Sequence, residues 1–132
     1  MTSKAEKIGA ALAKAVKATT GITSAALGSM MYRTNIQESD AMLFVLSNTR
    51  RANFWMKNCP ESISAAYITP EGLIAEIHRL EANNTNGVEA STDNIRFVLE
   101  TKEGWFERHH IGTNTTVRSE RGTLEETFLR GR

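Results

Sequence analysis

The stretch Phe54-Trp55-Met56-Lys57-Asn58-Cys59 combines a core-like pattern with an aromatic residue and a cation, and the rest of the chain is organised around it. Side chains of a β-strand alternate between the two faces of the sheet. A strand over residues 54–59 would divide them into two sets: Phe54, Met56 and Asn58 on one face, and Trp55, Lys57 and Cys59 on the other. We expect Phe54 and Met56 to be buried and the other face to offer a recognition surface.

The segments on either side of this stretch also read as strands. Residues 41–46 form a continuous apolar run of strand length, which is typical of a strand buried on both faces. Residues 65–69 and 73–78 flank Pro70-Glu71-Gly72, whose residue types favour a turn, so we expect an antiparallel hairpin. Residues 95–100 alternate apolar with polar side chains, which predicts a half-buried strand with Glu100 on its polar side.

The remaining segments predict loops and short helices. Residues 81–94 are polar and predict a long surface loop, whereas residues 102–110 change to a helical pattern that Gly112 is placed to end. Thr123 and Glu126 have the spacing of a capping box for a last short helix. Short strands that neighbour each other in sequence favour a mainly β (α+β) domain, a compact antiparallel barrel or sandwich with short helices.

The N-terminal segment differs in composition from this body. Residues 3–18 are rich in alanine and lysine, and we expect an amphipathic helix followed by a hinge over residues 19–29. The predicted organisation is a basic helical arm and hinge (residues 1–28), a β-rich domain (29–118) and a tail (119–132). Candidate contact residues of the arm are Lys4, Lys7, Ile8, Leu12, Lys14, Val16 and Lys17.

Length and charge restrict the function classes. A chain of 132 residues is long enough for one domain with its own core. Residues 1–28 carry four lysines and one glutamate, while residues 29–117 carry eight basic and eleven acidic residues. An acidic body and a lack of interleaved basic and aromatic residues argue against specific nucleic-acid binding. The arm is too charged for a secretory signal or a membrane span.

Candidate reactive residues do not form a recognised catalytic pattern. The single cysteine, Cys59, has no base at motif spacing and excludes an intrachain disulfide, so a buried thiol is expected. His78, His109 and His110 lack the spacing of a metal site, and packing or exposed histidines are expected instead. We expect no metal, no cofactor and no catalytic residue.

Five sequence blocks in order carry a family resemblance: Met-x-Arg, Met-Leu-Phe, Phe-Trp-Met-Lys-Asn, Gly-Leu-Ile-Ala-Glu-Ile, and Phe-Val-Leu-Glu with Gly-Trp-Phe-Glu-Arg-His. Together they resemble the domain-of-unknown-function family 192 of bacteria and archaea, over about residues 28–117. The resemblance implies a compact, mostly antiparallel β domain with short helices, and no established activity.

This chain departs from the family pattern at polar positions. Ser64 and Thr69 stand where the family has aspartates, and Asn114-Thr115 replaces a Gly-Asp pair. If those carboxylates serve a ligand or a proton transfer in the family, this chain has lost them. A matching apolar skeleton with altered polar positions is typical of a scaffold used for binding or structure.

The sequence therefore predicts a non-catalytic interaction or structural module whose N-terminal helix docks on a protein partner, on further copies of the chain, or on a larger assembly such as a virus or phage particle. The alternative is a soluble protein that binds a small anion through Arg33, Trp55, Lys57 and Asn58. A hydrolase-like enzyme comes third. The expected location is the cytoplasm, or the virion for a viral gene.

Overall fold

The computed structural model describes residues 16–22, 35–38, 40–56, 58–119 and 121–129. Its elements follow the chain in this order: β1 (Val16–Ile22), β2 (Ala41–Arg50), β3 (Asn53–Phe54), β4 (Ile63–Ile68), β5 (Ile74–Leu80), β6 (Val88–Glu89), β7 (Ile95–Lys102), α2 (Trp105–Arg108), β8 (Arg118–Ser119), β9 (Gly122–Thr123) and α3 (Leu124–Phe128). The predicted mainly β chain with few short helices is confirmed.

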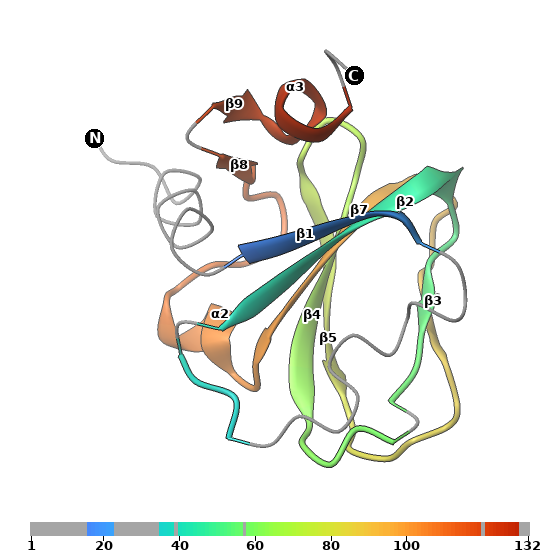
Figure 1. Cartoon of the computed structure of the whole chain (residues 1–132), viewed down its shortest axis with the longest axis vertical. Coiled ribbons are helices and arrows are strands. Elements are labelled where there is room, and N and C mark those ends of the chain that lie inside the picture. Colours follow the sequence, from blue (N-terminus) through green and yellow to red (C-terminus); the bar gives the residue numbers. More distant parts are fainter. Residues whose placement is uncertain (1–15, 23–34, 39, 57, 120, 130–132) are drawn as a thin grey trace.

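Five strands form one open, twisted sheet in the order β1-β2-β7-β4-β5 (Figure 1). β1 runs parallel to β2, and every other neighbouring pair in this sheet is antiparallel. β3 pairs with β6, and β8 pairs with β9. Because β1 and β5 lie at opposite edges, the described strands do not close on themselves. Of the expected barrel or sandwich, a closed barrel is therefore not formed by the described strands, while the expected antiparallel pairing is confirmed.

The central strands are buried on both faces. Figure 1 views the sheet nearly edge-on, with α2 and β8 on one side and β3 on the other. One core cluster, which includes Phe44, Phe54 and Tyr67, packs between the sheet and the β3 layer. A second cluster, which includes Phe97 and Phe106, packs between the sheet and the helices. Each fully buried aromatic or aliphatic side chain of this kind contributes about 1.5–3 kcal/mol to folding.

The two core clusters, one on each face of the sheet, explain which of the strand predictions are confirmed. β2 carries the predicted fully buried run, since Met42, Leu43, Phe44, Val45 and Leu46 are all buried. The predicted half-buried strand over residues 95–100 is buried on both faces instead, because one core cluster packs against each face of β7. Glu100, expected on a polar face, is thus in the interior.

The hairpin predicted around Pro70-Glu71-Gly72 is present as β4 and β5. The amide of Gly72 donates to the carbonyl oxygen of Thr69 (2.9 Å), and Gly72 has a φ of 91°, which a residue with a Cβ rarely adopts. The turn also receives a hydrogen bond from the amide of Val117 to the carbonyl oxygen of Gly72 (2.7 Å). The segment before β8 is therefore fixed against the hairpin.

The predicted capping box is confirmed at the start of α3. The Thr123 hydroxyl accepts a hydrogen bond from the amide of Glu126 (3.0 Å), and the Glu126 carboxylate accepts one from the amide of Thr123 (3.1 Å). Two amides that a helix start leaves without internal partners are satisfied in this way. The helix predicted over residues 102–110 is shorter in the structure: it is α2, which starts after Gly104.

The predicted strand over residues 54–59 is wrong after Phe54. Phe54 and Met56 are buried and Trp55 is exposed, as the alternation requires, but Asn58 is exposed and Cys59 is buried. Asn58 has a φ of 60°, a left-handed conformation that asparagine tolerates better than most residues. This turn reverses the alternation, so the face assignment of Asn58 and Cys59 is the opposite of the expected one.

The N-terminal prediction falls mostly outside the described residues, including Lys4, Lys7, Ile8, Leu12 and Lys14. Where the chain is described, residues 16–18 are not the end of a helix and residues 19–22 are not a hinge: both belong to β1, with Val16 opposite Ala41. The sequence Val16-Lys17-Ala18-Thr19-Thr20-Gly21-Ile22 has four β-branched residues, which favour a strand. In the part of the chain that is described, no helix is long and apolar enough to cross a membrane.

Candidate functional site

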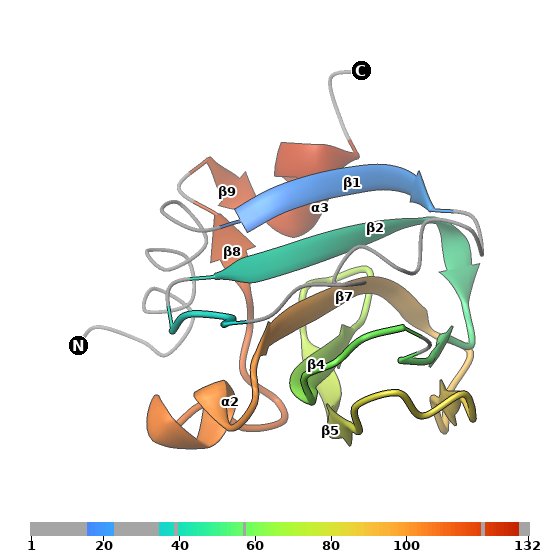
Figure 2. The same ribbon diagram turned by 60° about the horizontal axis from the view of Figure 1, so that its bottom comes forward.

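A two-stranded flap covers one face of the sheet. We define it as residues 52–56, 58, 59 and 83–90, which include β3 and β6. Its two arms are joined by backbone hydrogen bonds from Ala90 to Ala52 (2.8 Å), from Met56 to Asn84 (2.9 Å) and from Asn83 to Cys59 (2.9 Å). Figure 2 shows β3 alongside the segment that contains β6, in front of the sheet. The flap thus closes over the cluster of Phe44, Phe54 and Tyr67.

The flap is attached to the sheet by packing and by hydrogen bonding to Tyr67. Phe54, Met56 and Cys59 point into the core, and the ring of Phe54 packs edge-on against Phe44 with centroids 5.1 Å apart. The Tyr67 hydroxyl, on β4, donates a hydrogen bond to the carbonyl oxygen of Val88, on β6. Burial is the main cause that raises the pKa of Tyr67, so this hydroxyl stays a donor.

Glu100 is the unexpected group beneath the flap. It stands on β7 opposite Met42 on one side and Ala65 on the other, and it is 2% exposed. Its Oε1 atom is a buried oxygen without a hydrogen-bond partner among the described residues. Burial raises the pKa of Glu100 to about 8, so the carboxyl is largely neutral at pH 7.

Cys59 belongs to the same interior. It is buried, as expected, and burial followed by the charge of Glu100 raises the pKa of its thiol. A thiol rather than a thiolate is therefore present at neutral pH, and thiols are weak nucleophiles. This environment disfavours a catalytic role for Cys59.

The four predicted ligand-binding residues are only partly described. Arg33 and Lys57 lie outside the described residues. Trp55 is 41% exposed and Asn58 is exposed, and both lie on the turn that ends the first arm of the flap. The structure therefore places two of the four residues on one short segment at the surface.

Two of the histidines make structural contacts on separate parts of the molecule. Glu76 binds His78 through one oxygen (2.7 Å) and accepts hydrogen bonds from the hydroxyl and amide of Ser91 (both 2.8 Å) through the other. Burial alone would raise the pKa of Glu76, but the hydrogen bonds from His78 and Ser91 outweigh it and lower the pKa. The carboxylate, and not the histidine, is the central group, so this is not a serine–histidine–acid triad.

The second histidine contact joins α2 to the segment before β2. Glu38 accepts two hydrogen bonds from Arg108 (2.7 and 3.1 Å) and contacts His109 Nε2 (2.9 Å). The imidazole of His109 stacks on Trp105 with centroids 4.2 Å apart. The hydrogen bond from Arg108 is the main cause that lowers the pKa of Glu38. His78 and His109 are packing residues, as predicted, and His110 is exposed.

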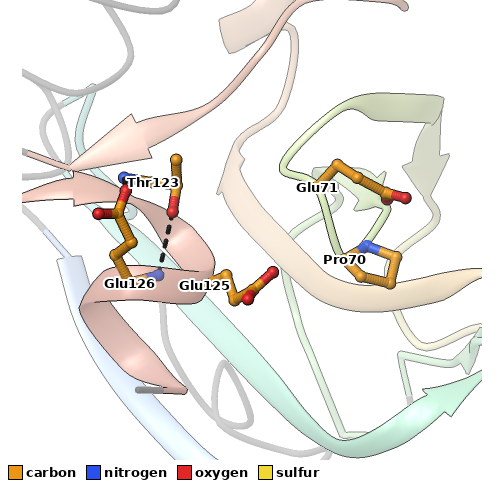
Figure 3. A pocket seen from close by; sticks show the side chains of 5 residues that line it. All are labelled: Pro70, Glu71, Thr123, Glu125 and Glu126. Carbon is orange, nitrogen blue, oxygen red and sulfur yellow. Dashed lines mark hydrogen bonds between the residues drawn. The ribbon is translucent and has the colours of Figure 1, made fainter. Parts of the chain in front are cut away.

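An acidic hollow lies between the hairpin turn and α3. It has a volume of about 320 Å³ and is lined by Pro70, Glu71, Thr123, Glu125 and Glu126. Figure 3 shows Glu125 extending toward Pro70, with Glu126 on the far side of the helix start. Because Glu126 serves the capping box, this hollow is in part a consequence of how α3 begins.

Ser64 and Thr69, which stand where the family pattern has aspartates, make structural hydrogen bonds. The Ser64 hydroxyl accepts a hydrogen bond from the amide of Gly104 (2.9 Å), just before α2. The Thr69 hydroxyl accepts one from the amide of Leu73 (3.1 Å), within the hairpin. At the buried Ser64, a hydroxyl makes this contact without the charge that an aspartate would bring into the interior.

The model of the family DUF192, described as an uncharacterized ACR, matches residues 7–119. The chain belongs to the DUF192 family. The match begins before the sequence blocks quoted above and includes β1, which agrees with the place of β1 in the sheet. Among the curated proteins, none matches this chain.

Two solved structures have a fold similar to that of this DUF192 domain. A putative transcription regulator from Sinorhizobium meliloti 1021 is 23% identical, with a TM-score of 0.67 over 75% of this chain and 78% of the other. A protein of unknown function from Novosphingobium aromaticivorans DSM 12444 is 21% identical, with a TM-score of 0.69 over 78% and 74%. These similarities show the fold alone.

Sequence reasoning missed Glu100 as a site residue. The sequence did contain an indication of its burial. Val98 lies on the same face of the strand as Glu100, and an apolar residue on that face indicates that the face is covered. The contact of Glu38 with Arg108 was not predictable in this way, since the two residues are 70 positions apart.

Proposed function

We propose that this DUF192 domain is a non-catalytic interaction module whose basic N-terminal segment docks on a protein partner or on another copy of the chain. The observation that carries the proposal is the placement of β1. It is an edge strand of the sheet, and its first residue, Val16, pairs with Ala41. Residues 1–15 directly precede this strand in the sequence, so a partner bound to them would be tethered at that edge of the sheet.

The distribution of charge supports docking by attraction. Residues 1–15 carry Lys4, Lys7 and Lys14 against one acidic residue, Glu6. The body has the opposite balance, with eleven acidic and eight basic residues between positions 29 and 117. A second copy, or a partner with an acidic surface, is thus the complementary kind of target.

The states of the reactive side chains support a role without catalysis. The hydroxyl of Ser91 is bonded to Glu76, His78 is bonded to the same carboxylate, and Cys59 is a buried thiol. A nucleophile needs a base within hydrogen-bond reach and access to substrate. Cys59 lacks access because it is buried, and the carboxylate beside Ser91 has a lowered pKa, which makes Glu76 a weak base.

A pair of truncations tests the proposal. Removal of residues 1–15 keeps β1 and should leave the thermal stability nearly unchanged while abolishing self-association in sedimentation velocity, or capture of the partner from an extract of the source cells. Removal of residues 1–22 also deletes β1, exposes the edge of β2 and should lower the melting temperature. A 1–15 truncation that associates like the full chain refutes the proposal.

The exposed indole of Trp55 favours a second candidate, the binding of a small anion at the turn that carries Trp55 and Asn58. Large aromatic side chains exposed beside polar groups are frequent in binding sites. The second tryptophan, Trp105, is 5% exposed and would not respond. A change in tryptophan fluorescence on adding a carboxylate or phosphate, lost in Trp55→Phe and in Lys57→Ala, would support this candidate. An unchanged signal with all such anions would eliminate it.

A further inference from the structure

The second arm of the flap contains the dipeptide Asn86-Gly87. The chain has nine asparagines, at positions 35, 48, 53, 58, 83, 84, 86, 94 and 114, and only Asn86 is followed by a glycine. Glycine has no Cβ, so its backbone nitrogen is less hindered and more freely oriented than that of other residues. In an Asn-Gly pair this nitrogen can approach the side-chain carbonyl carbon of the asparagine.

The structure leaves the two groups of this pair accessible. Asn86 and Gly87 are both exposed and lie in the turn before β6. The backbone amide of Asn86 donates to Oδ1 of Asn84 (2.8 Å), so this amide is held by the turn. The Asn86 side chain and the Gly87 amide make no hydrogen bond to the residues that the structure describes. Within the described parts of the chain, no competing contact keeps them apart.

We propose that Asn86 is a site of spontaneous covalent modification and that its isoaspartate form releases the flap from the sheet. This inference is independent of the proposed docking function. In the first step, the Gly87 nitrogen loses its proton to solvent and bonds to Cγ of Asn86. The bond from Cγ to the side-chain nitrogen breaks, and this nitrogen takes up a proton and leaves as ammonia. The product is a cyclic imide.

Water completes the modification. One water molecule opens the imide ring at either of its two carbonyl carbons. Opening at one carbonyl gives an aspartate, and opening at the other gives an isoaspartate, in which the backbone runs through the former side chain. Both products carry a new negative charge, but only the isoaspartate lengthens the backbone, by one carbon or about 1.5 Å.

The modified residue lies between two fixed points of the flap. On one side, the carbonyl oxygen of Asn84 accepts a hydrogen bond from the amide of Met56 (2.9 Å). On the other side, Val88 pairs with Phe54 and accepts the hydrogen bond from the Tyr67 hydroxyl. Only residues 85–87 separate these points. The extra backbone carbon therefore displaces at least one of the two contacts.

The close packing at Gly87 extends the disturbance to the strand pair. A Cβ on Gly87 would lie 1.8 Å from Oδ1 of Asn53, so the Asn53 amide lies directly against the Gly87 backbone. Asn53 belongs to β3, where it pairs with Glu89 of β6. These strands have two residues each, and so short a pair is marginally stable without its packing on the sheet. A shift at Gly87 thus weakens the whole flap.

The test is the ageing of the purified full-length protein under native conditions at mildly alkaline pH. Trypsin releases residues 80–96 as one peptide with four asparagines, at positions 83, 84, 86 and 94. Fragmentation in a mass spectrometer assigns the mass gain to one of them, and an isoaspartyl methyltransferase labels the isoaspartate form. Release of the flap is followed by the reaction of the buried Cys59 with a thiol reagent and by hydrogen exchange at the Met56 amide.

Two variants separate the steps of the proposal. Asn86→Gln keeps a neutral amide but disfavours the cyclisation, because the longer side chain must close a larger ring. Freshly purified Asn86→Asp carries the charge of the products without the additional backbone carbon. The other three asparagines of the same tryptic peptide are internal controls for the modification itself.

We expect the modification to appear several times faster at Asn86 than at the other asparagines, and to accelerate with rising pH because the attacking nitrogen must lose a proton. The aged native chain should react faster at Cys59 and lose protection at Met56, whereas aged Asn86→Gln and fresh Asn86→Asp should not.

Three results would overturn the proposal or one of its steps. Product at Asn86 in urea but not in the folded protein overturns the site. Product at Asn86 in the folded protein with unchanged reactivity of Cys59 overturns the release of the flap. Equal reactivity of Cys59 in fresh Asn86→Asp and in the aged native chain overturns the role of the added carbon.

Discussion

Tyr67 on β4 and Val88 on β6 are joined by a hydrogen bond from the phenol to the backbone carbonyl, and this bond ties the flap to the sheet. Tyr67→Phe removes the donor and keeps the ring. We expect a loss of about 1 kcal/mol in the free energy of unfolding. In hydrogen exchange the flap amides of Met56 and Ala90 should lose protection, while those of the β2–β7 ladder keep it. Equal protection of the flap amides in both proteins would show that the bond does not hold the flap.

Met56 and Trp55 are neighbours in sequence with opposite environments, 2% and 41% exposed. Met56→Ala should cost about 2–4 kcal/mol, because it removes core contacts and leaves a cavity. Trp55→Ala should cost about 0.5 kcal/mol or less, as for other surface substitutions. Chemical denaturation of both variants measures the difference. Similar losses would mean that the first arm of the flap is not packed as described.

Gly72 and Gly112 form a second matched pair. A Cβ on Gly72 would lie 2.8 Å from the carbonyl oxygen of Val117, and the φ of 91° is unfavourable for alanine, whereas a Cβ on Gly112 meets nothing within 4 Å. Gly72→Ala should therefore destabilise the protein by about 1–3 kcal/mol. Gly112→Ala should leave the melting temperature nearly unchanged. A thermally neutral Gly72→Ala would contradict the described hairpin turn.

These positions show what could be predicted from the sequence. The apolar run of β2, the turn between β4 and β5 and the capping box at Thr123 are local signals, and all three were interpreted correctly. The left-handed Asn58 and the strand at Val16–Ile22 were not predicted. The turn at Asn58 depends on the backbone conformation of that one residue. The strand Val16–Ile22 depends on pairing with β2, in which Val16 lies opposite Ala41, 25 positions later in the sequence.

The candidate site was predicted less completely than the fold. Trp55 was correctly assigned to the exposed face of the central stretch, but Asn58 was assigned to the face of Phe54 and Met56, and Glu100 to a polar face. Alternation along one strand shows which side chains share a face, and only the packing of other elements decides whether that face is covered. The flap that covers Glu100 comes from residues 52–56, 58, 59 and 83–90, and the last of these segments has no strong apolar pattern.

Glu38 provides a prediction about pH. Hydrogen bonds from Arg108 hold its pKa below the usual value of 4.5. A carboxylate whose pKa is lowered by folding contributes stability above its unfolded pKa, and that contribution is lost as the pH falls through the folded pKa. Because the pair is more than 40% exposed, Glu38→Gln should cost less than about 1 kcal/mol at pH 7. The two proteins should converge in stability as the pH falls through the lowered pKa of folded Glu38. A difference that stays constant with pH would exclude the ion pair as its cause.

The central claim is that the positive charge of residues 1–15 mediates association. The most direct measurement is sedimentation velocity of the full-length chain with Lys4, Lys7 and Lys14 all changed to glutamine, alone and mixed with the partner where one is known. This variant keeps the length of the chain and β1. We predict that the native chain associates at 50 mM salt and dissociates as the salt is raised, because exposed charges are screened over about 10 Å at 0.1 M salt. The variant should remain dissociated at every salt concentration. A variant that associates as strongly as the native chain, with the same dependence on salt, would contradict the account.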